Sequence, residues 1–358
     1  MMLKLIVALV FSFVPGSAFP PSSVTTVQGA PVSGTWRLRL QDNWTSTRRD
    51  GERWVSIRMR RETDRSFGIS LPMSELEGAG IRGDAWSGSN VSFSLKRDAG
   101  TIDFTGSFDS GRGTGDFTFT PNAEFVRAMQ ARDKSITSDD VLRLAIHDVS
   151  RSFIQAVEAQ GYPNLDTDDL IKMRIHGVDA DYIAAFRKAG YDKLSVEDLV
   201  KTRIHGATPE FVQEMKAAGF DKLSVEELVK MRIHGVTPAF IREMRDLGFK
   251  DLDTEELVKM RIHGVTASFV KELRDLGFMD LDTEDLVKMR IHGVTPQYIR
   301  ELKDLGYGNV GKEQLVRFRI HNVTPQFIRD VRAAGFKDMT ADDLVDFAIH
   351  GRRWLSKR

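Results

Sequence analysis

The sequence predicts a β + α multidomain protein, in which a small antiparallel β barrel or sandwich is followed by an α-solenoid of 29-residue, two-helix repeats. Two observations predict this division. Apolar and polar residues alternate with a period of two over residues 34–120, as they do in half-buried strands. From residue 121 to 358 the apolar period becomes helical, and about eight similar segments recur every 29 residues with atypical ends, which is typical of a solenoid.

The first eighteen residues have the features of a signal peptide. A short basic start precedes an apolar run over residues 5–14, and the small residues Gly16 and Ala18 suit a signal peptidase. The apolar run is shorter than the roughly 20 residues that a membrane-spanning helix needs. We therefore expect residues 1–18 to be removed, which leaves an exported, periplasmic or extracellular protein without a transmembrane span. A retained N-terminal anchor is the alternative.

Composition excludes several classes of site. The chain contains no cysteine, so it has no disulfide framework, thiolate zinc site or thiol nucleophile. It has 51 basic and 51 acidic residues, and a net charge of zero provides no global field that attracts nucleic acid or an anionic membrane. Residues 19–33 are rich in Pro, Ser, Thr, Val and Gly, and they are the expected linker.

Six or seven strands are expected in the β domain. In the first, Trp36 and Leu38 alternate with arginines, and later runs alternate in the same way. The Gly111-Arg-Gly113-Thr-Gly115 segment is a weak glycine motif that lies between two strands. Because no helix follows it, a hairpin turn fits better than a phosphate-binding loop.

Residues 224–252 show how the first helix of a unit is expected to begin and end. Ser224 is the N-cap, Glu227 completes a capping box, and Gly235 ends the helix directly after His234. The corresponding pairs in the other units are Thr137/Asp140, Asp166/Asp169, Ser195/Asp198, Asp253/Glu256, Asp282/Asp285, Thr340/Asp343 and, as the weak one, Gly311/Gln314.

The second helix of the unit begins at once. Thr237 is its expected cap, Pro238 fills the first helical position, and Gly248 ends it. Helices of about ten residues are not stable alone, so stacked units must bury each other's apolar sides. The residues expected on the apolar sides of this unit are Leu228, Val229, Met231, Ile233, Phe240, Ile241 and Met244.

All eight histidines occupy one position of the repeat, each after an isoleucine. They are His147, His176, His205, His234, His263, His292, His321 and His350. A histidine at a helix C-terminus complements the helix dipole. Stacked helices lie about 8–10 Å apart, whereas zinc binds nitrogen at about 2 Å, so one histidine per unit cannot complete a metal site. We interpret the histidines as structural repeat markers, with pH sensing as the alternative and no metal site expected.

An arginine precedes each interior histidine by two residues: Arg174, Arg203, Arg232, Arg261, Arg290 and Arg319. Acids recur at a matching interval, at Glu214, Glu243, Glu272, Glu301 and Asp330. We expect ion pairs and hydrogen bonds between these two ladders.

The second helices carry a basic stripe, which is the candidate partner-binding surface. Its members are Arg242, Arg245, Lys271, Arg274, Arg300, Lys303, Arg329 and Arg332. The spacing of three residues places each pair on one helix face, where it suits an acidic partner. Acids at Asp246, Asp275 and Asp304 lie close by, so a solvated, nearly neutral face is the alternative.

Enzyme motifs are missing from the sequence. It contains no His-Glu-x-x-His, no Gly-x-Ser-x-Gly and no P-loop, and every histidine belongs to the repeat. We therefore expect neither an enzyme nor a cofactor.

The repeat segment from Arg232 to Phe249, which contains Ile-His-Gly-Val-Thr-Pro, resembles repeats of bacterial exported proteins. These include the extracytoplasmic tails of relatives of the β-lactam-sensor transmembrane metallopeptidases. The likeness covers roughly residues 121–350, and the preceding β domain with Gly34-Thr-Trp36 is similar to that group as well. The chain lacks the group's multi-helix membrane region and zinc-protease motif, so the resemblance implies only the exported portion, without peptidase activity.

We therefore expect a non-enzymatic exported binding or scaffolding protein, whose solenoid holds a protein or an envelope polymer. One alternative is a nucleic-acid-binding array, suggested by a weaker likeness to helix-hairpin-helix modules. The single glycine in each turn, the export signal and the zero net charge argue against it. The other alternative is that the β domain is a small-ligand carrier or a cryptic hydrolase.

Overall fold

The computed structural model describes residues 31–40, 53–61, 65–78 and 88–351. The predicted signal peptide and most of the predicted linker lie outside these residues. The chain forms two compact units, one ending at Ile154 and the other beginning at Gln155. The first unit therefore contains the β domain together with the first two helices, and α3 (Arg151–Ala159) spans the boundary.

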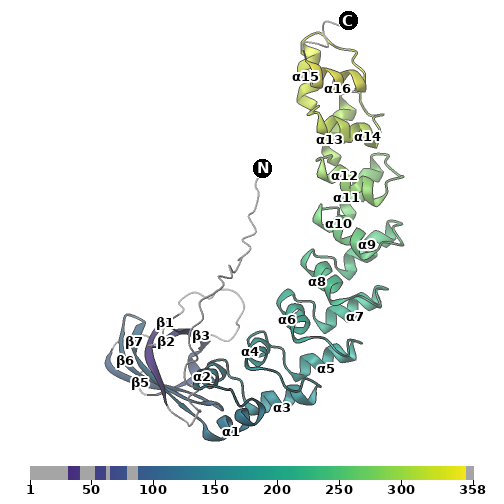
Figure 1. Cartoon of the computed structure of the whole chain (residues 1–358). Helices are drawn as coiled ribbons and strands as arrows, with labels where there is room; N and C mark the ends of the chain where they lie inside the picture. Colours follow the sequence, from purple (N-terminus) through teal and green to yellow (C-terminus); the bar gives the residue numbers. More distant parts are fainter. Residues whose placement is uncertain (1–30, 41–52, 62–64, 79–87, 352–358) are drawn as a thin grey trace, which may run out of the picture. The chain divides into compact units, whose positions relative to one another are not determined.

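The first unit is built on one antiparallel sheet of seven strands, in the order β3-β2-β1-β7-β6-β5-β4. The sheet curls into a half-barrel (Figure 1), which confirms the predicted antiparallel β domain. Among the described strands β3 and β4 form the edges, so the barrel is not closed. The strands are β1 (Val32–Leu40), β2 (Trp54–Arg61), β3 (Ser66–Pro72), β4 (Leu76–Glu77), β5 (Gly88–Arg97), β6 (Gly100–Asp109) and β7 (Arg112–Pro121).

Trp36 organises the inner face of the sheet. Its indole Nε1 donates a hydrogen bond of 3.1 Å to the carbonyl oxygen of Thr105 on β6, so the ring crosses the intervening strand β7. Gly115 lies opposite Trp36 on β7, and Gly106 lies opposite Gly115 on β6. Phenylalanine rings from β5 and β6 pack edge-on against the indole, with centroid distances of 5.2 and 5.9 Å. A Cβ atom on either glycine would meet backbone atoms of the neighbouring strand, so the two glycines allow β6 and β7 to approach closely beneath the indole.

The glycine-rich segment forms a hairpin, as predicted. The turn between β6 and β7 consists of Ser110 and Gly111, whose φ angles are 49° and 77°. Positive φ at both central positions is the feature of a type I′ turn, whose twist matches that of the paired strands. Gly113 continues in β7, where a Cβ atom would lie 2.2 Å from the Phe108 ring. This glycine therefore makes room for the core.

Helix α2 (Ser138–Ile146) covers the sheet. It follows α1 (Ala123–Arg132) and lies against β1, β6 and β7. Thr137 and Asp140 form the predicted capping box at its start. In the first turn of α2, Asp139 pairs with both Arg61 and Arg65. The apolar residues of α2, including Ile146, are completely buried.

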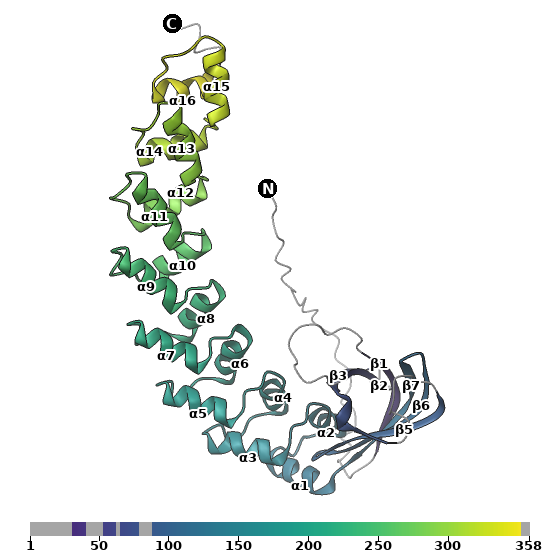
Figure 2. The same cartoon turned by 180° about the vertical axis from the view of Figure 1, so that it is seen from behind.

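The second unit is an array of short helices in regular repeat, which confirms the predicted solenoid (Figures 1 and 2). The first helices of successive units lie against one another, and so do the second helices, which gives two layers. The first helices are α4 (Thr167–Ile175), α6 (Val196–His205), α8 (Val225–Ile233), α10 (Thr254–Ile262), α12 (Thr283–Ile291), α14 (Lys312–Ile320) and α16 (Ala341–His350). The second helices are α5 (Ala180–Lys188), α7 (Pro209–Ala217), α9 (Pro238–Asp246), α11 (Ala267–Asp275), α13 (Pro296–Asp304) and α15 (Pro325–Ala333).

The predicted caps lie where the sequence places them. Ser224 and Glu227 form a capping box at the start of α8, and equivalent boxes begin α10, α12 and α16. Asp166 and Ser195 cap α4 and α6 through their side chains, but the reciprocal bond of the predicted capping box does not form there. Gly311, the weak cap, provides no side-chain bond. The helix α8 ends at Ile233, one residue before the predicted end at His234, which is its C-cap, and Gly235 follows with a φ of 70°. Since a β-carbon disfavours this left-handed conformation, glycine suits the turn between the two helices.

The apolar core of a unit differs from the prediction at one position. Leu228, Val229 and Met231 of α8 are buried, with at most 3% of each residue exposed. Ile233, which we expected beside them, is 55% exposed. The reason is the helical period, because Ile233 is five residues from Leu228 and turns away from the neighbouring layer. Within the described residues, no helix combines the length and apolarity that crossing a membrane requires.

Candidate functional site

The most distinctive surface of the array is a row of exposed isoleucines, one at the end of each first helix. Each precedes a histidine of the repeat, and we call the row the isoleucine ladder. The exposed fractions lie between 46% and 55%, and the members are Ile175, Ile204, Ile233, Ile262, Ile291, Ile320 and Ile349. In α2, which is the first helix of the first repeat, the equivalent residue Ile146 is fully buried. The ladder is therefore a property of the array.

The geometry of the first helices explains the exposure. In α10, Leu257, Val258 and Met260 point toward the neighbouring helices and are buried. Ile262 comes seven residues after Glu255, which is two turns, so the two side chains share the solvent side of the helix. Single exposed apolar residues are common on protein surfaces. A row of seven at one repeat position of one helix layer is different, because an exposed apolar side chain recurs there in every unit of the array.

Ion pairs between successive first helices flank the ladder. A basic residue three positions before an isoleucine pairs with an acid in the first turn of the next first helix. Lys172 pairs with Glu197 at 3.2 Å, and Lys230 pairs with Glu255 at 3.5 Å. The same contact joins Lys201 to Glu226 and Arg317 to Asp342. The apolar row thus has a polar but electrically balanced rim, which resembles the core and rim of a protein interface.

The histidines lie at the joint between the two helices of each unit, as the repeat predicts. In α10 and α12 the histidine that follows the helix is its C-cap, and its backbone N–H bonds back to helix carbonyls. Among the described residues, no group of three His, Asp or Glu side chains is placed to hold a metal ion. At the end of α2, in the first repeat, burial lowers the pKa of His147, and the charge of Arg143 lowers this pKa further.

The arginines before the histidines make a different contact from the predicted one. Their guanidinium carbons lie 4.4–5.3 Å from the centroid of an aromatic ring in the preceding unit. The pairs are Arg203/Tyr182, Arg232/Phe211, Arg261/Phe240, Arg290/Phe269 and Arg319/Tyr298. Within the described chain, none of these five arginines forms an ion pair with the predicted acids, so that expectation is wrong for them.

Two of these arginines also bond to the joint of the preceding unit. Arg290 Nε donates to the carbonyl oxygen of His263 at 3.4 Å, and Arg319 Nε donates to that of His292 at 3.2 Å. The carbonyl groups at a helix C-terminus lack partners within the helix and carry partial negative charge. An arginine that lies over an aromatic ring can also donate to these carbonyl groups, which an arginine paired with a solvated carboxylate would not do. The arginine ladder therefore joins repeat units.

The structure divides the predicted basic stripe into two groups. Arg245, Arg274 and Arg332 are half-buried between units. Arg274 and Arg332 donate to the carbonyl oxygens of Leu247 and Leu305, and all three lie over an aromatic ring of the preceding unit. The exposed members are Arg242, Lys271, Arg300, Lys303 and Arg329. Of these, Arg300 pairs with Glu272 at 3.2 Å.

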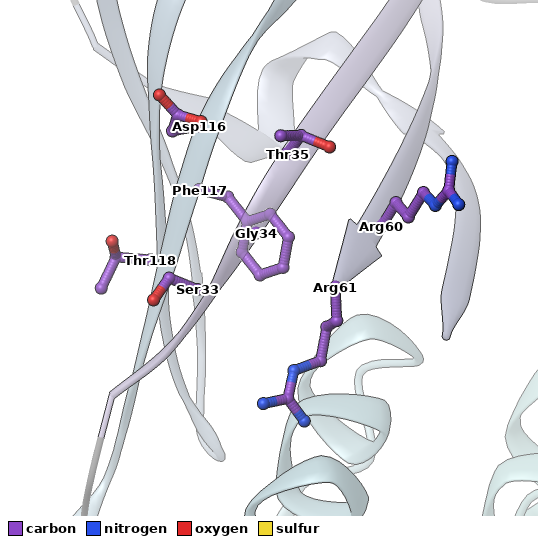
Figure 3. A pocket seen from close by; sticks show the side chains of 8 residues that line it. All are labelled: Ser33, Gly34, Thr35, Arg60, Arg61, Asp116, Phe117 and Thr118. Carbon is purple, nitrogen blue, oxygen red and sulfur yellow. The ribbon is translucent and has the colours of Figure 1, made fainter. Parts of the chain in front are cut away.

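Several hollows lie between neighbouring strands of the β domain. One of about 440 Å³ is lined by Gly34, Thr35, Arg60 and Phe117, among others (Figure 3). In that view Arg60 and Arg61, although adjacent on β2, point to different sides. The inner face of the sheet is filled by buried aromatic and aliphatic side chains, including Trp36.

No protein-family model matches the chain, and no curated protein matches it. The resemblance to exported repeat proteins therefore stays a prediction that depends on the repeat motif and on the likeness of the β domain. The candidate site is accordingly defined by the surface of the array. Sequence analysis grouped Ile233 with the core and missed the ladder, although the seven-residue offset of each isoleucine from an exposed acid was a usable signal.

Proposed function

We propose that this is a non-enzymatic exported binding or scaffolding protein, and that the isoleucine ladder holds an elongated protein partner. The observation that carries the proposal is the recurrence of a half-exposed isoleucine at one position of every first helix of the array. The core already has its own apolar residues, so these seven add little to folding. An apolar ladder also suits a protein partner better than a polar envelope polymer. The assignment to an exported compartment depends on residues 1–18, which lie outside the described part of the chain.

Energetic arguments indicate that the partner must span several units. Full burial of an isoleucine contributes about 1.5–3 kcal/mol, so covering a half-exposed one contributes about 1 kcal/mol. Association costs at least about 4 kcal/mol in lost freedom of motion. One isoleucine is therefore insufficient, and about five must be covered together. Because packed helices lie about 8–10 Å apart, the partner should present apolar side chains at a similar interval.

The two alternatives, a nucleic-acid-binding array and a β domain that carries a small ligand, receive less support. Several basic residues of the array contact carbonyl groups and aromatic rings, which leaves fewer of them for nucleic-acid phosphates. The filled inner face of the sheet provides little room for a carried ligand.

The test replaces Ile233, Ile262 and Ile291 with glutamine in the full-length chain. Peptides selected from a displayed random library against the wild-type chain serve as the ligands, and fluorescence anisotropy measures their affinity. Three anchors of about 1 kcal/mol each correspond to a loss of affinity of about a hundredfold. Stability should change by less than about 0.5 kcal/mol, because the replaced side chains are exposed and glutamine is a good helix former.

Met279→Gln provides the matched control, because Met279 is 64% exposed but lies outside the ladder. We expect this variant to bind as the wild type does. The proposal fails if the triple variant keeps wild-type affinity. It also fails if the wild-type chain selects no peptide and captures no saturable partner from an envelope extract.

A further inference from the structure

Five arginines gather on the outer face of the β domain. Arg37 and Arg39 lie on β1, Arg58 and Arg60 on β2, and Arg112 on β7, and all five side chains are exposed. The residues that alternate with them along β1 and β2 are buried on the inner face. Since successive side chains of a strand point to opposite faces, the arginines share the solvent face of three neighbouring strands. We call this set the arginine row.

Strand register makes the row continuous. Arg37 lies directly opposite Arg58, and Arg39 lies directly opposite Arg112. Opposed residues of an antiparallel pair have Cβ atoms about 5 Å apart, and residues two apart along a strand are about 6.7 Å apart. The order Arg60, Arg58, Arg37, Arg39, Arg112 therefore runs diagonally across the three strands, with steps of about 5–7 Å.

Four members of the row lack the acidic partners that charges elsewhere in this unit have. Within the described residues, Arg37, Arg39, Arg58 and Arg112 form no ion pair, although Asp109 lies opposite Arg112 and Asp116 lies opposite Thr35. Other basic residues of this unit form ion pairs with acidic side chains. Examples are Arg61 and Arg65 with Asp139, Lys96 with Glu77, Arg97 with Glu75, and Arg151 with Asp98.

Like charges placed directly opposite each other destabilise a sheet. The Arg37/Arg58 pair therefore costs stability in the free protein, and a bound anion would remove that cost. The guanidinium fork binds phosphate through two parallel hydrogen bonds, which is why arginine is favoured where phosphate groups are recognised. The four forks of Arg37, Arg39, Arg58 and Arg112 in one row suit a ligand with several phosphates in series.

The surroundings of the row narrow the class of ligand. Thr35 and Thr114 share the outer face with the arginines and are exposed. The same face of β2 carries Trp54, which is half-buried four residues before Arg58, so little of its ring is open for a nucleic-acid base to stack on. Among the described residues, this face of β1, β2 and β7 has no exposed apolar side chain that could enter a bilayer.

We propose that the arginine row binds a flexible linear polymer through its phosphate groups alone. This site is separate from the isoleucine ladder. The β domain thus has a ligand of its own, which is polyanionic, whereas the partner of the isoleucine ladder is apolar where it binds.

The test uses the full-length chain and long-chain inorganic polyphosphate as the probe, with binding measured by calorimetry at several salt concentrations. Arg37→Gln/Arg58→Gln removes the two opposed charges. We expect the affinity to fall by about tenfold or more at low salt. The slope of log affinity against log salt should also become shallower by about 1.4, because each phosphate contact contributes about 0.7. Arg242→Gln/Arg329→Gln, which changes two exposed arginines of the array, should bind as the wild type does.

Thermal melting shows whether the Arg37/Arg58 variant has lost only its binding or also its folded structure. Removing the opposed charges should leave the melting temperature unchanged or raise it by up to about 3 °C. A lowered melting temperature would contradict the argument from repulsion. The proposal is overturned if polyphosphate does not bind at low salt, or if the Arg37/Arg58 variant binds it normally. Equal binding of polyglutamate would overturn the assignment to phosphate, and much tighter binding of a single-stranded oligonucleotide would show that bases are recognised.

Discussion

Gly115→Ala is expected to destabilise the β domain by about 3–4 kcal/mol, which combines overpacking with a lost buried hydrogen bond. A Cβ atom on this residue would lie 1.9 Å from the carbonyl oxygen of Thr105 and 2.6 Å from the Cα of Gly106. Both are backbone atoms of β6, so they cannot move aside without opening the pairing of β6 with β7. The same carbonyl accepts the indole hydrogen bond of Trp36. Denaturant titration, followed by tryptophan fluorescence, measures the loss.

Gly68→Ala is the matched control for this prediction. Gly68 is exposed on β3, and a Cβ atom there would meet no atom within 4 Å. Alanine should be neutral or stabilise the sheet by up to about 1 kcal/mol, because glycine loses more conformational freedom on folding. Similar losses of stability in the two variants would show that Gly115 does not have the packing role described above.

Leu257→Ala is expected to cost about 2–5 kcal/mol and to divide the array into two weakly coupled segments. Leu257 is fully buried in α10, and the cavity left by its side chain adds to the lost burial. In an array each unit contacts only its neighbours, so a weak central unit interrupts the cooperativity between the units on either side. Hydrogen exchange resolved along the chain should show faster exchange in α10, with a difference in protection between the two sides.

Leu344→Ala makes the same change in the last helix, at the equivalent position of α16, where the leucine is 1% exposed. It should release α16 while leaving the protection of α10 unchanged, because only one neighbour depends on that helix. If both substitutions lowered protection uniformly along the whole array, the nearest-neighbour description would be wrong.

The sequence predicted the array well because its signals are local. Caps such as Ser224 with Glu227, glycine at the left-handed joint and proline at the first helical position each act within a few residues. Even the weak cap at Gly311 was visible in the sequence. The end of α8 was one residue off, at Ile233 instead of His234, whereas α6 and α16 end at their histidines as predicted; such a difference is a usual uncertainty at a helix terminus.

The candidate surfaces depend on contacts between elements and were harder to predict. Arg261 was expected to meet a carboxylate, but its position over Phe240 depends on how one unit stacks on the next. The arginine row requires the register that places Arg37 opposite Arg58, which the alternation of residues alone does not give. The exposure of Ile262 follows from its angular position on α10, although its apolar character suggested the core.

Photo-crosslinking tests most directly the central claim that the isoleucine ladder is the binding surface. A photoreactive amino acid is placed at Ile262 in one full-length protein and at Met279 in another, and both are irradiated in intact cells that produce the protein. Both sites are more than half exposed, at 53% and 64%, so both can react with a neighbouring molecule. The account predicts a protein adduct from position 262 and none from position 279. An adduct from position 279 without one from position 262 would contradict it.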